Sequence, residues 1–466
     1  MIQLRPYQQK CVTEVGQQFR QGFRAVLLVA PTGAGKTVMF SYMADTYLSR
    51  RKRVLIVAHR KELISQASKK LKAAGIPHGI IAPWAEQVPE LVQVGSVQTL
   101  RGRLGKLPRF DLIVIDEAHH SVAGDWACLL ASQPQALVCG VTASPERTDG
   151  KSLGVNDGGV YESMILGPTI AELIALGFLT PAKVYAPSIP DMIGIRTKKG
   201  DFDTTQLAKL MGKPECIANV VEHYRKHADG LPTICFCPSV EVAEEYAAAF
   251  RSAGYRSVAA HGDMEPDERT DALSGLETGA VQVVTACDLI SEGVDVPCVA
   301  CVILCRPTKS LGLHIQQVGR GLRPMEGKTC LIVLDFAGNT LRFGLPDTEY
   351  QWSLDPLPRN KKERAAPSGW VCDCGTVNAP RTMKCTECEE FRTIEGARTE
   401  RPELHPVALE ELDEEKARMW REMSYQDMMD TARTEQDFID IAQARGYRAG
   451  WIKKAMQECP HILGAA

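Results

Sequence analysis

The sequence lacks the features that would indicate a membrane protein, a secreted protein or a broadly basic surface. Its formal net charge is −3 over 466 residues, which argues against binding polyanions over the whole surface and confines any nucleic-acid site to a local groove. The longest apolar runs, such as "VACVILC", are far shorter than the roughly 20 residues of a bilayer-spanning helix. The N-terminal "MIQLRPYQQK" has no apolar signal-peptide core. We therefore expect a soluble, cytoplasmic protein with no membrane partner.

The sequence also lacks the pattern of a disulfide framework. Twelve of the 16 cysteines are scattered along the chain, several of them in apolar runs (Cys139, Cys235, Cys301 and Cys305). Such cysteines behave as small buried apolar residues, and cytosolic proteins keep them reduced. The other four lie within 17 positions and need a separate explanation.

Short β-branched runs alternate with helical stretches over about the first 340 residues, which is typical of parallel α/β folds. Ten of these runs are almost continuously apolar, as strands buried on both faces of a sheet are. Ten strands are many for one doubly wound sheet, so we predict two tandem α/β domains. The predicted strands are "AVLLVA", "RVLIVA", "LVQVGS", "DLIVID", "ALVCGV", "TICFCP", "RSVAA", "VQVVTA", "VACVILC" and "TCLIVLDF".

The rest of the chain differs in composition from these two domains. We place the first domain at residues 1–167 and the second at residues 168–355, which open with a less regular passage. The basic, proline-bearing "PLPRNKKERAAPSG" predicts a linker at residues 356–369. A cysteine-rich module at residues 370–390 follows, and residues 391–466 favour helix. We find no internal repeat.

A glycine-rich turn follows the first predicted strand directly, in "VLLVAPTGAGKT". Gly33 and Gly35 let the main-chain N–H groups curl around phosphate at the start of the next helix. Lys36 would reach the β- and γ-phosphates, and the hydroxyl of Thr37 would hold magnesium. A chance glycine-rich turn is the alternative. The strand before it, the predicted helix after it and the GKT ending favour a phosphate site.

Two adjacent carboxylates end the predicted strand "DLIVIDEAHH". Asp116 fits water-mediated magnesium binding, and Glu117 fits the base that orients or deprotonates an attacking water. Alone, such a pair is often a solvated turn, but together with the phosphate loop it predicts nucleotide hydrolysis. His119 is a candidate coupling residue, whereas His120 is interpreted as incidental.

Two arginines three residues apart stand in "HIQQVGRGLRP" of the second predicted domain. If this segment is helical, Arg320 and Arg323 lie on one face and could reach a γ-phosphate across a cleft. A pair of ordinary surface arginines is the alternative, which the spacing by itself favours.

Taken together, the segments resemble the superfamily 2 helicases, in particular the DEAH-bearing bacterial and phage group around the RadD repair helicase. The resemblance covers roughly residues 2–345, and its motifs follow the family order. Alanine is common at position 30 in that family, and Ser144 stands where threonine is usual. The matching segments are "LRPYQQ" (4–9), "APTGAGKT" (30–37), "AHRKEL" (58–63), "GSVQTL" (95–100), "DEAH" (116–119), "TASP" (142–145), "CFCPSV" (235–240), "TACDLISEGVDVP" (285–297), "QQVGRGLR" (316–323) and "LDFAGN" (334–339).

The resemblance implies two RecA-like domains with ATP and magnesium in the cleft between them. The nucleotide-binding residues that it implies are Arg5, Tyr7, Gln8, Pro31, Thr32, Gly33, Ala34, Gly35, Lys36, Thr37, Gly293 and Asp295. The implied catalytic residues are Lys36, Asp116, Glu117, Gln316, Arg320 and Arg323. The implied coupling residues are His119, Thr142 and Ser144.

The resemblance also implies a nucleic-acid track across both domains, where polar side chains hold the backbone without reading sequence. For each of these residues singly, a structural role at a strand end is an equal alternative. The candidate phosphate contacts are Arg60, Ser96, Gln98, Thr99, Ser239 and Thr285.

The clustered cysteines form a CxC pair, ten residues and a CxxC pair, a set that can complete a closed zinc site. The four candidate zinc ligands are Cys372, Cys374, Cys385 and Cys388. An iron–sulfur cluster and a site without metal are the alternatives. With Trp370 and Asn378 in register, the pattern resembles the Ran-binding-protein type of zinc finger, although that family separates its first cysteines by two to four residues. Members of that finger family bind single-stranded RNA or proteins, so the resemblance suggests an auxiliary grip in which Arg381 and Lys384 could meet phosphate.

The C-terminal segment predicts a small helical bundle that packs Phe438, Ile441 and Trp451. Helix-turn-helix contact with DNA is the alternative, and the acidic "EELDEE" is interpreted as a solvated face. The basic candidates for DNA contact here are Arg445, Arg448, Lys453 and Lys454.

The leading hypothesis is an ATP-dependent DNA helicase or translocase acting in repair, recombination or replication. Single-stranded or forked DNA would be its substrate, and a replication or repair protein could bind its C-terminal region. The same motor on RNA and a zinc-finger adaptor with a vestigial ATPase are the alternatives. We expect ATP, Mg²⁺ and Zn²⁺ as ligands, and a nucleoid-associated or phage-encoded protein in a bacterial host.

Overall fold

A computed structural model of the chain describes most residues of its first 392. The described residues are 2–121, 124–147, 151–186, 192, 194–198, 200–287, 296–355, 369–380, 382–392, 419–420, 422–432, 434–445 and 455. They fall in two compact units, Met1–Arg392 and Thr393–Ala466. None of the described helices is long and apolar enough to cross a membrane.

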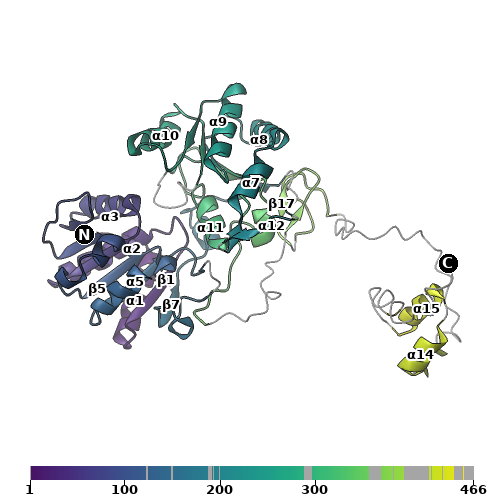
Figure 1. The fold of residues 1–466 in the computed structure, drawn as a ribbon, viewed down its shortest axis with the longest axis horizontal. Helices are drawn as coiled ribbons and strands as arrows, with labels where there is room; N and C mark the ends of the chain where they lie inside the picture. Colours follow the sequence, from purple (N-terminus) through teal and green to yellow (C-terminus); the bar gives the residue numbers. More distant parts are fainter. Residues whose placement is uncertain are drawn as a thin grey trace. The chain divides into compact units, whose positions relative to one another are not determined.

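The first unit contains two parallel α/β domains, purple to blue and teal to green in Figure 1. The sheet of the first domain has seven strands in the order β3-β4-β2-β5-β6-β1-β7, and all its strand pairs are parallel. Its strands are β1 (Ala25–Val29), β2 (Val54–Ala58), β3 (Gly79–Ile81), β4 (Val92–Ser96), β5 (Leu112–Asp116), β6 (Leu137–Thr142) and β7 (Ser163–Leu166). Its helices are α1 (Pro6–Arg20), α2 (Lys36–Leu48), α3 (Lys61–Ala73), α4 (Val97–Arg101) and α5 (Asp125–Ser132), with short 3-10 turns η1 (Leu104–Lys106), η2 (Ala118–His120) and η3 (Val155–Asp157).

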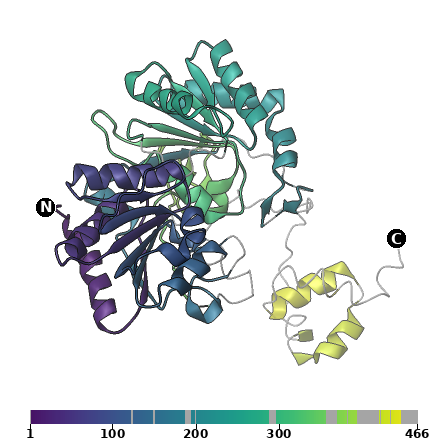
Figure 2. The same cartoon turned by 60° about the vertical axis from the view of Figure 1, so that its left-hand side comes forward.

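Helices cover both faces of this first sheet (Figure 2). Side chains alternate along each strand, so Val26 and Leu28 of β1 pack with α1, α2 and α3. Leu27 and Val29 point to the opposite face and pack with α4 and α5. Because both faces are buried, the strands are almost continuously apolar, which is the pattern used to predict them.

The second domain is built on a six-stranded sheet in the order β12-β13-β11-β14-β15-β8, again with parallel pairs. Its strands are β8 (Ala182–Tyr185), β11 (Thr233–Phe236), β12 (Ser257–Ala260), β13 (Val283–Ala286), β14 (Cys301–Leu304) and β15 (Leu331–Asp335), and a separate hairpin pairs β9 (Thr197–Lys198) with β10 (Asp201–Phe202). The helices described between residues 170 and 343 are α6 (Ile170–Ala175), α7 (Thr204–Met211), α8 (Pro214–His227), α9 (Val240–Ser252), α10 (Pro266–Thr278), α11 (Leu311–Gly319) and α12 (Asn339–Phe343).

The predicted fold class is therefore confirmed, and all ten predicted segments contain strands. Three further strands of the two large sheets, β3, β7 and β8, were not predicted from the sequence. Each lies at an edge of its sheet, where one side has no strand neighbour and continuous apolar character is not required.

A four-cysteine module, defined here as residues 369–392, completes the first unit. It contains the antiparallel pair β16 (Trp370–Val371) and β17 (Val377–Asn378). The proposed linker at residues 356–369 lies outside the described residues except for Gly369.

The second unit is described only in part, around α14 (Tyr425–Thr431) and α15 (Glu435–Arg445). Phe438 and Ile441 are buried in its core beside Trp420, as the predicted helical packing requires. Arg445 donates a hydrogen bond from Nε to the Trp420 carbonyl at 2.7 Å, so its guanidinium serves this packing. Trp451, Arg448, Lys453, Lys454 and the acidic "EELDEE" lie outside the described residues.

Candidate functional site

The phosphate loop connects β1 to α2 and needs glycine at two positions. Gly33 and Gly35 have φ of 90° and 80°, values that L side chains rarely adopt. The space around them is also filled: a Cβ at Gly33 would stand 2.6 Å from Cδ2 of Leu179. Gly35 is the N-cap of α2, so the loop presents the start of a helix, where main-chain N–H groups favour phosphate.

Lys36, the first residue of α2, folds back over this loop. Its Nζ donates hydrogen bonds to the carbonyls of Ala30 at 3.1 Å and Pro31 at 3.4 Å. Burial lowers the pKa of the Lys36 amine, and the neighbouring carboxylates of Glu117 and Asp116 act in the opposite direction. The loop therefore holds a half-buried amine close to two acidic groups, which suits an anionic phosphate chain with a divalent cation.

Asp116 and Glu117 are both buried at the end of β5. The main-chain N–H of Glu117 donates to Oδ1 of Asp116 at 3.1 Å. Glu117 has a φ of 51°, an uncommon left-handed conformation for a residue other than glycine, asparagine or aspartate. Strain of this kind is often found at active sites, and here it turns Glu117 away from the strand direction.

The three candidate coupling residues lie together beside Glu117. Nδ1 of His119 lies 3.4 Å from Oε2 of Glu117 and 3.1 Å from Oγ1 of Thr142. Thr142 in turn donates from Oγ1 to the Ser144 carbonyl at 2.7 Å and accepts from the Ser144 N–H at 3.2 Å. A Cβ at Gly312, on α11 of the second domain, would stand 2.8 Å from Oγ of Ser144. The contacts thus run from the acidic pair to the second domain.

The candidate adenine-binding residues contact the phosphate loop through a single carbonyl. Gln8 donates from Nε2 to the Ala34 carbonyl at 3.0 Å, and the Tyr7 hydroxyl donates to the same carbonyl at 3.1 Å. The main-chain N–H of Arg5 donates to Oε1 of Gln8 at 3.0 Å. The segment that holds Gln8 is therefore tied to the loop that holds Lys36.

Phe178 lies beside Arg5 and Tyr7, and the sequence did not predict a role for it. The Arg5 guanidinium lies 3.7 Å from the centroid of its ring, and the Tyr7 ring centroid lies 5.6 Å away. An isolated phenylalanine in "LGFLTP" carries no motif, so only the position of the unpredicted strand β8 downstream could have pointed to it.

The arginines of the second domain approach the phosphate loop from the end of α11. A Cβ at Gly319 would stand 2.8 Å from Cβ of Thr32, and both Arg320 and Arg323 influence the pKa of Lys36. Gln316 is buried on the same helix. The helix ends at Gly319, with Arg320 as its C-cap, so the expectation that both arginines share one helix face is wrong. Burial lowers the pKa of Arg323 to about 10, which leaves it charged at neutral pH.

The segment after α11 is held by hydrogen bonds to its main-chain carbonyls. Thr180 donates from its main-chain N–H and from Oγ1 to the Leu322 carbonyl, each at 2.8 Å. Lys328 donates from Nζ to the carbonyl of Arg323 at 2.8 Å and to that of Gly321. Because the carbonyls are fixed, residues 320–323 keep one main-chain path beside the phosphate loop.

The candidate nucleic-acid contacts follow the carboxyl ends of strands, but their surroundings differ. Arg60 is the N-cap of α3 and Ser96 that of α4. Oγ of Ser96 donates to Oε1 of Gln98 at 2.6 Å, and Nε2 of Gln98 donates to the His59 carbonyl at 3.3 Å. These contacts join the segments after β2 and β4, and Thr99 follows on α4.

In the second domain the corresponding side chains have local partners. Ser239 caps α9 by accepting from the Val242 N–H at 3.2 Å. Thr285 is fully buried in β13, and its hydroxyl donates to the Ala243 carbonyl at 2.7 Å. The structure favours a structural role for Thr285, since a buried and engaged hydroxyl does not reach a phosphate. Gly293 and Asp295 lie outside the described residues.

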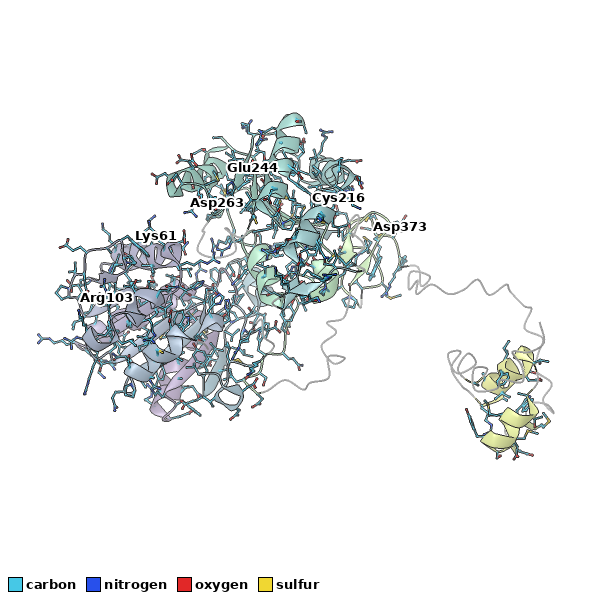
Figure 3. All side chains as sticks on the ribbon, viewed as in Figure 1. Lys61, Arg103, Cys216, Glu244, Asp263 and Asp373 are labelled. Atoms are coloured by element: carbon cyan, nitrogen blue, oxygen red, sulfur yellow. The ribbon has the colours of Figure 1, made fainter. Side chains whose placement is uncertain are left out.

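The four sulfur atoms of the module converge. Their Sγ atoms all lie within 4.8 Å of one another, with 3.4 Å between those of Cys372 and Cys388 and 3.7 Å between those of Cys374 and Cys385. A tetrahedral zinc site with Zn–S bonds of about 2.3 Å separates its sulfurs by about 3.8 Å. The donor set therefore fits zinc, and the single residue between the first two cysteines, Asp373 (labelled in Figure 3), does not prevent convergence.

The two residues that the sequence analysis placed in register also support the cysteine turns. Nδ2 of Asn378 lies 3.5 Å from Sγ of Cys385, and Oδ1 accepts from the main-chain N–H of Thr386 at 2.9 Å. Trp370 donates from Nε1 to the Thr382 carbonyl at 2.7 Å. Lys384 forms an ion pair with Glu389 at 2.8 Å, while Arg381 lies outside the described residues.

The module packs on the edge strand β8 of the second domain. Tyr185 pairs with Thr376 in an antiparallel bridge, and the Ala186 N–H donates to the Gly375 carbonyl at 3.0 Å. Val377 is buried in a core cluster with the second sheet, and Lys183 forms an ion pair with Glu387 at 2.7 Å. The sequence analysis expected a module joined to the two domains by a linker; the contacts show that it also packs against the edge of the second sheet.

Both domains match families of known proteins. Residues 1–147 match the family model "Type III restriction enzyme, res subunit", and residues 212–325 match "Helicase conserved C-terminal domain". A "51.5 kDa protein" of a Lactococcus phage is 34% identical, over 78% of this chain and 74% of that protein. The Saccharomyces cerevisiae protein named "Putative ATP-dependent helicase IRC3" is 30% identical over 72% of this chain, which spans about half (51%) of the yeast protein.

One solved structure is similar over both domains. It is the fragment of a "putative HsdR subunit of a type I restriction enzyme" from Vibrio vulnificus YJ016. It superposes with a TM-score of 0.58 at 25% sequence identity, covering 73% of this chain and 65% of that one.

Proposed function

The chain belongs to the superfamily 2 helicases, with two ATP-dependent helicase domains of RecA-like fold, and from this membership we propose that it is a DNA-stimulated helicase or translocase. The observation that carries the proposal is the approach of residues 320–323 of the second domain to the phosphate loop that holds Lys36. A nucleotide bound at that loop would touch both domains. Binding and hydrolysis would then close and open the gap between them.

We propose the following roles at the nucleotide. Lys36 and the main-chain N–H groups of the loop bind the phosphates, and Arg320 and Arg323 stabilise the charge that develops on the γ-phosphate. Glu117 orients the attacking water and accepts its proton. Magnesium, held by Thr37 and Asp116, would supply further neutralisation of phosphate charge.

Further roles fall on three surrounding groups. Arg5, Tyr7 and Gln8 would read the adenine, and Gln316 would complete the site from α11. His119, Thr142 and Ser144 would transmit changes at Glu117 to α11, because their contacts connect Glu117 with this helix.

The choice of DNA rests on the family that the first domain matches and on a similar solved structure. The matching family model is named for a restriction enzyme, as is the similar solved structure, and restriction enzymes act on DNA. We place the chain in the RadD-like group, because the DEAH residues 116–119 and the segment "LDFAGN" match it and a cysteine module follows the motor. Repair or recombination is the process that this placement favours, and a phage relative fits a phage-encoded origin.

Zinc is the metal that we propose for the module, in a finger of the Ran-binding-protein type. The sulfur separations, and the support from Asn378 and Trp370, carry this proposal. We propose that the first domain comprises residues 1–167 and the second domain residues 168–355, because β7 belongs to the first sheet and β8 to the second.

The test is the ATPase rate of the full chain with single-stranded DNA, duplex DNA, forked DNA and RNA. We expect stimulation by single-stranded and forked DNA. Glu117→Gln should keep ATP binding and lose at least about 100-fold in turnover, the typical contribution of a general base. Glu222→Gln, on the exposed face of α8, is the matched control and should behave as the natural chain.

Stimulation by RNA alone would contradict the DNA proposal and favour an RNA motor. A chain that no polynucleotide stimulates would instead point to an adaptor. A Glu117→Gln variant with full turnover would refute the catalytic assignment.

A further inference from the structure

An exposed tryptophan lies on the loop that follows β3. Trp84 is 46% exposed, and Nζ of Lys61 lies 5.5 Å from the centroid of its ring. Lys61 is the first residue of α3 and is labelled on the first domain in Figure 3. The pair thus presents an aromatic face and a cation side by side on the surface.

The sheet order places this pair on the rim that carries the nucleic-acid candidates. Strands β3, β4 and β2 are neighbours and parallel, so their carboxyl ends meet at one edge of the sheet. Arg60 and Lys61 follow β2, Ser96 ends β4 and Gln98 follows it, and Trp84 follows β3. Trp84 therefore extends the same row by one strand, at its outer end.

The loop that carries Trp84 is held in place. Nε2 of Gln93 donates to the carbonyls of Val88 at 2.8 Å and Glu90 at 2.9 Å. Arg103 donates from Nη1 to Oε1 of Gln87 at 3.0 Å. A loop whose second half is held in this way loses less conformational entropy when a ligand binds, which favours binding by its exposed side chain.

The surroundings of Trp84 combine apolar and polar side chains. Pro83, Ala85 and the exposed Val88 are apolar, whereas Glu86 and Gln87 are polar. Lys61 supplies a positive charge beside the ring, and this pairing favours a base with its adjoining phosphate as the ligand. The acidic Glu86 lines a cavity with Ser68 and His78, toward the other end of α3 from Lys61.

We propose that Trp84 stacks on a base of single-stranded nucleic acid that leaves the first domain, while Lys61 contacts the adjoining phosphate. This proposal rests on the proposed function, since it extends the track of the motor. Every base has an aromatic face, so stacking grips the strand without reading its sequence. Stacking of this kind typically changes affinity by about 5- to 100-fold when the aromatic residue is replaced by alanine.

The test is fluorescence anisotropy of a labelled oligothymidylate with the full chain, for the natural protein, Trp84→Ala and Trp84→Phe. We expect Trp84→Ala to bind about 5- to 100-fold more weakly and Trp84→Phe to bind nearly as well as the natural chain. Val88→Ala is the matched control, because Val88 lies in the same loop and is 45% exposed; its affinity should not change.

Salt dependence separates stacking from charge. Trp84→Ala should leave the slope of log affinity against log salt concentration unchanged. Lys61→Ala should reduce the steepness of this slope by about the amount that one phosphate contact contributes. An unchanged affinity for Trp84→Ala, or an equal loss on blunt duplex DNA, would overturn the proposal. If polynucleotides stimulate the natural chain while Trp84→Ala binds normally, this inference fails and the proposed function stands; if none stimulates the natural chain, the proposed function fails first.

Discussion

The hydroxyl of Thr180 donates a hydrogen bond to the main-chain carbonyl of Leu322 at 2.8 Å, between the two candidate arginines in the sequence. Thr180 belongs to a connecting segment, residues 178–186, that touches several parts of the site in turn. Phe178 lies against Arg5, Leu179 against Gly33, and Ala186 hydrogen-bonds to the four-cysteine module. One short stretch of chain thus joins the nucleotide site to the module.

Thr180→Val should slow ATP hydrolysis by about fivefold. The substitution keeps the shape of the side chain but removes a buried hydrogen bond, which typically contributes about 1 kcal/mol, and a loss of that size in positioning the arginines corresponds to about fivefold in kcat. Steady-state ATPase assays with saturating single-stranded DNA measure it. Thr180→Ser retains the hydroxyl and is the control; equal activity of the serine and valine variants would contradict the role.

Phe178→Ala should raise the KM for ATP by about 3- to 30-fold with little change in kcat. The ring contacts Arg5 and Tyr7, and a cation over an aromatic ring contributes about 0.5–2 kcal/mol. If an interaction stabilises bound ATP equally in the ground state and in the transition state, its loss raises KM and leaves kcat unchanged. Phe23→Ala, at an exposed phenylalanine, is the matched control. A kcat that falls as far as kcat/KM would show that Phe178 acts on the chemical step instead.

The sequence was sufficient for the parts of the fold whose signal is local. The ten buried strands are continuous apolar runs, and the glycines around Lys36 satisfy main-chain angles that the loop itself requires. The carboxylates of Asp116 and Glu117 lie at the carboxyl end of β5, the position that their place after an apolar run predicts. Each of these features depends on neighbours within a few residues.

The parts that sequence reasoning missed depend on contacts far apart in the chain. Strand β8 is an edge strand with only partial burial, so its "AKVY" has no strong apolar pattern. The module packs there through main-chain groups of Ala186 and Gly375, which every residue type carries. The place of Phe178 depends on Arg5, more than 170 residues earlier. No spacing within the sequence records such pairings.

Removal of the proposed zinc from the module should loosen the edge of the second sheet. Without a cation the four sulfurs take up protons and lose their common partner, and a segment of this size has too small a core to fold without the metal. The contacts at Tyr185 and Ala186 would then be lost, since Thr376 and Gly375 lie between the cysteine pairs. Faster hydrogen exchange at residues 182–186, measured by mass spectrometry after chelation or in Cys385→Ser, checks this.

Cys128→Ser is the matched control for this experiment, because Cys128 is a free, half-buried cysteine on α5 of the first domain. It should retain the metal content and exchange rates of the natural chain. Exchange at residues 182–186 that stays slow after complete metal loss would show that the module's packing does not depend on its metal. The exposed ion pair of Lys183 and Glu387 should matter little, since such pairs contribute at most about 1 kcal/mol.

Stability should fall as the pH drops from 6.5 toward 4, because of His314. This residue is buried on α11 against the Phe343 ring, and burial lowers its pKa from 6.5 to about 4. Asp335 acts to raise that pKa and Arg342 to lower it, but burial is the largest effect. The unfolded chain binds more protons than the folded chain between these two pKa values, so the contribution is complete above pH 6.5 and is lost toward pH 4.

The expected loss from this histidine is about 2 kcal/mol between pH 7 and pH 5, by linkage. Urea unfolding followed at both pH values measures it, and His314→Phe should flatten the dependence because phenylalanine does not titrate. His227→Gln is the comparison, since burial also lowers the pKa of His227, which is less buried than His314. If His314→Phe kept the full slope while His227→Gln removed it, the acid sensitivity would come from α8. If the pH dependence of stability does come from His314, low pH destabilises α11 first. This helix ends beside the phosphate loop and leads to the two arginines.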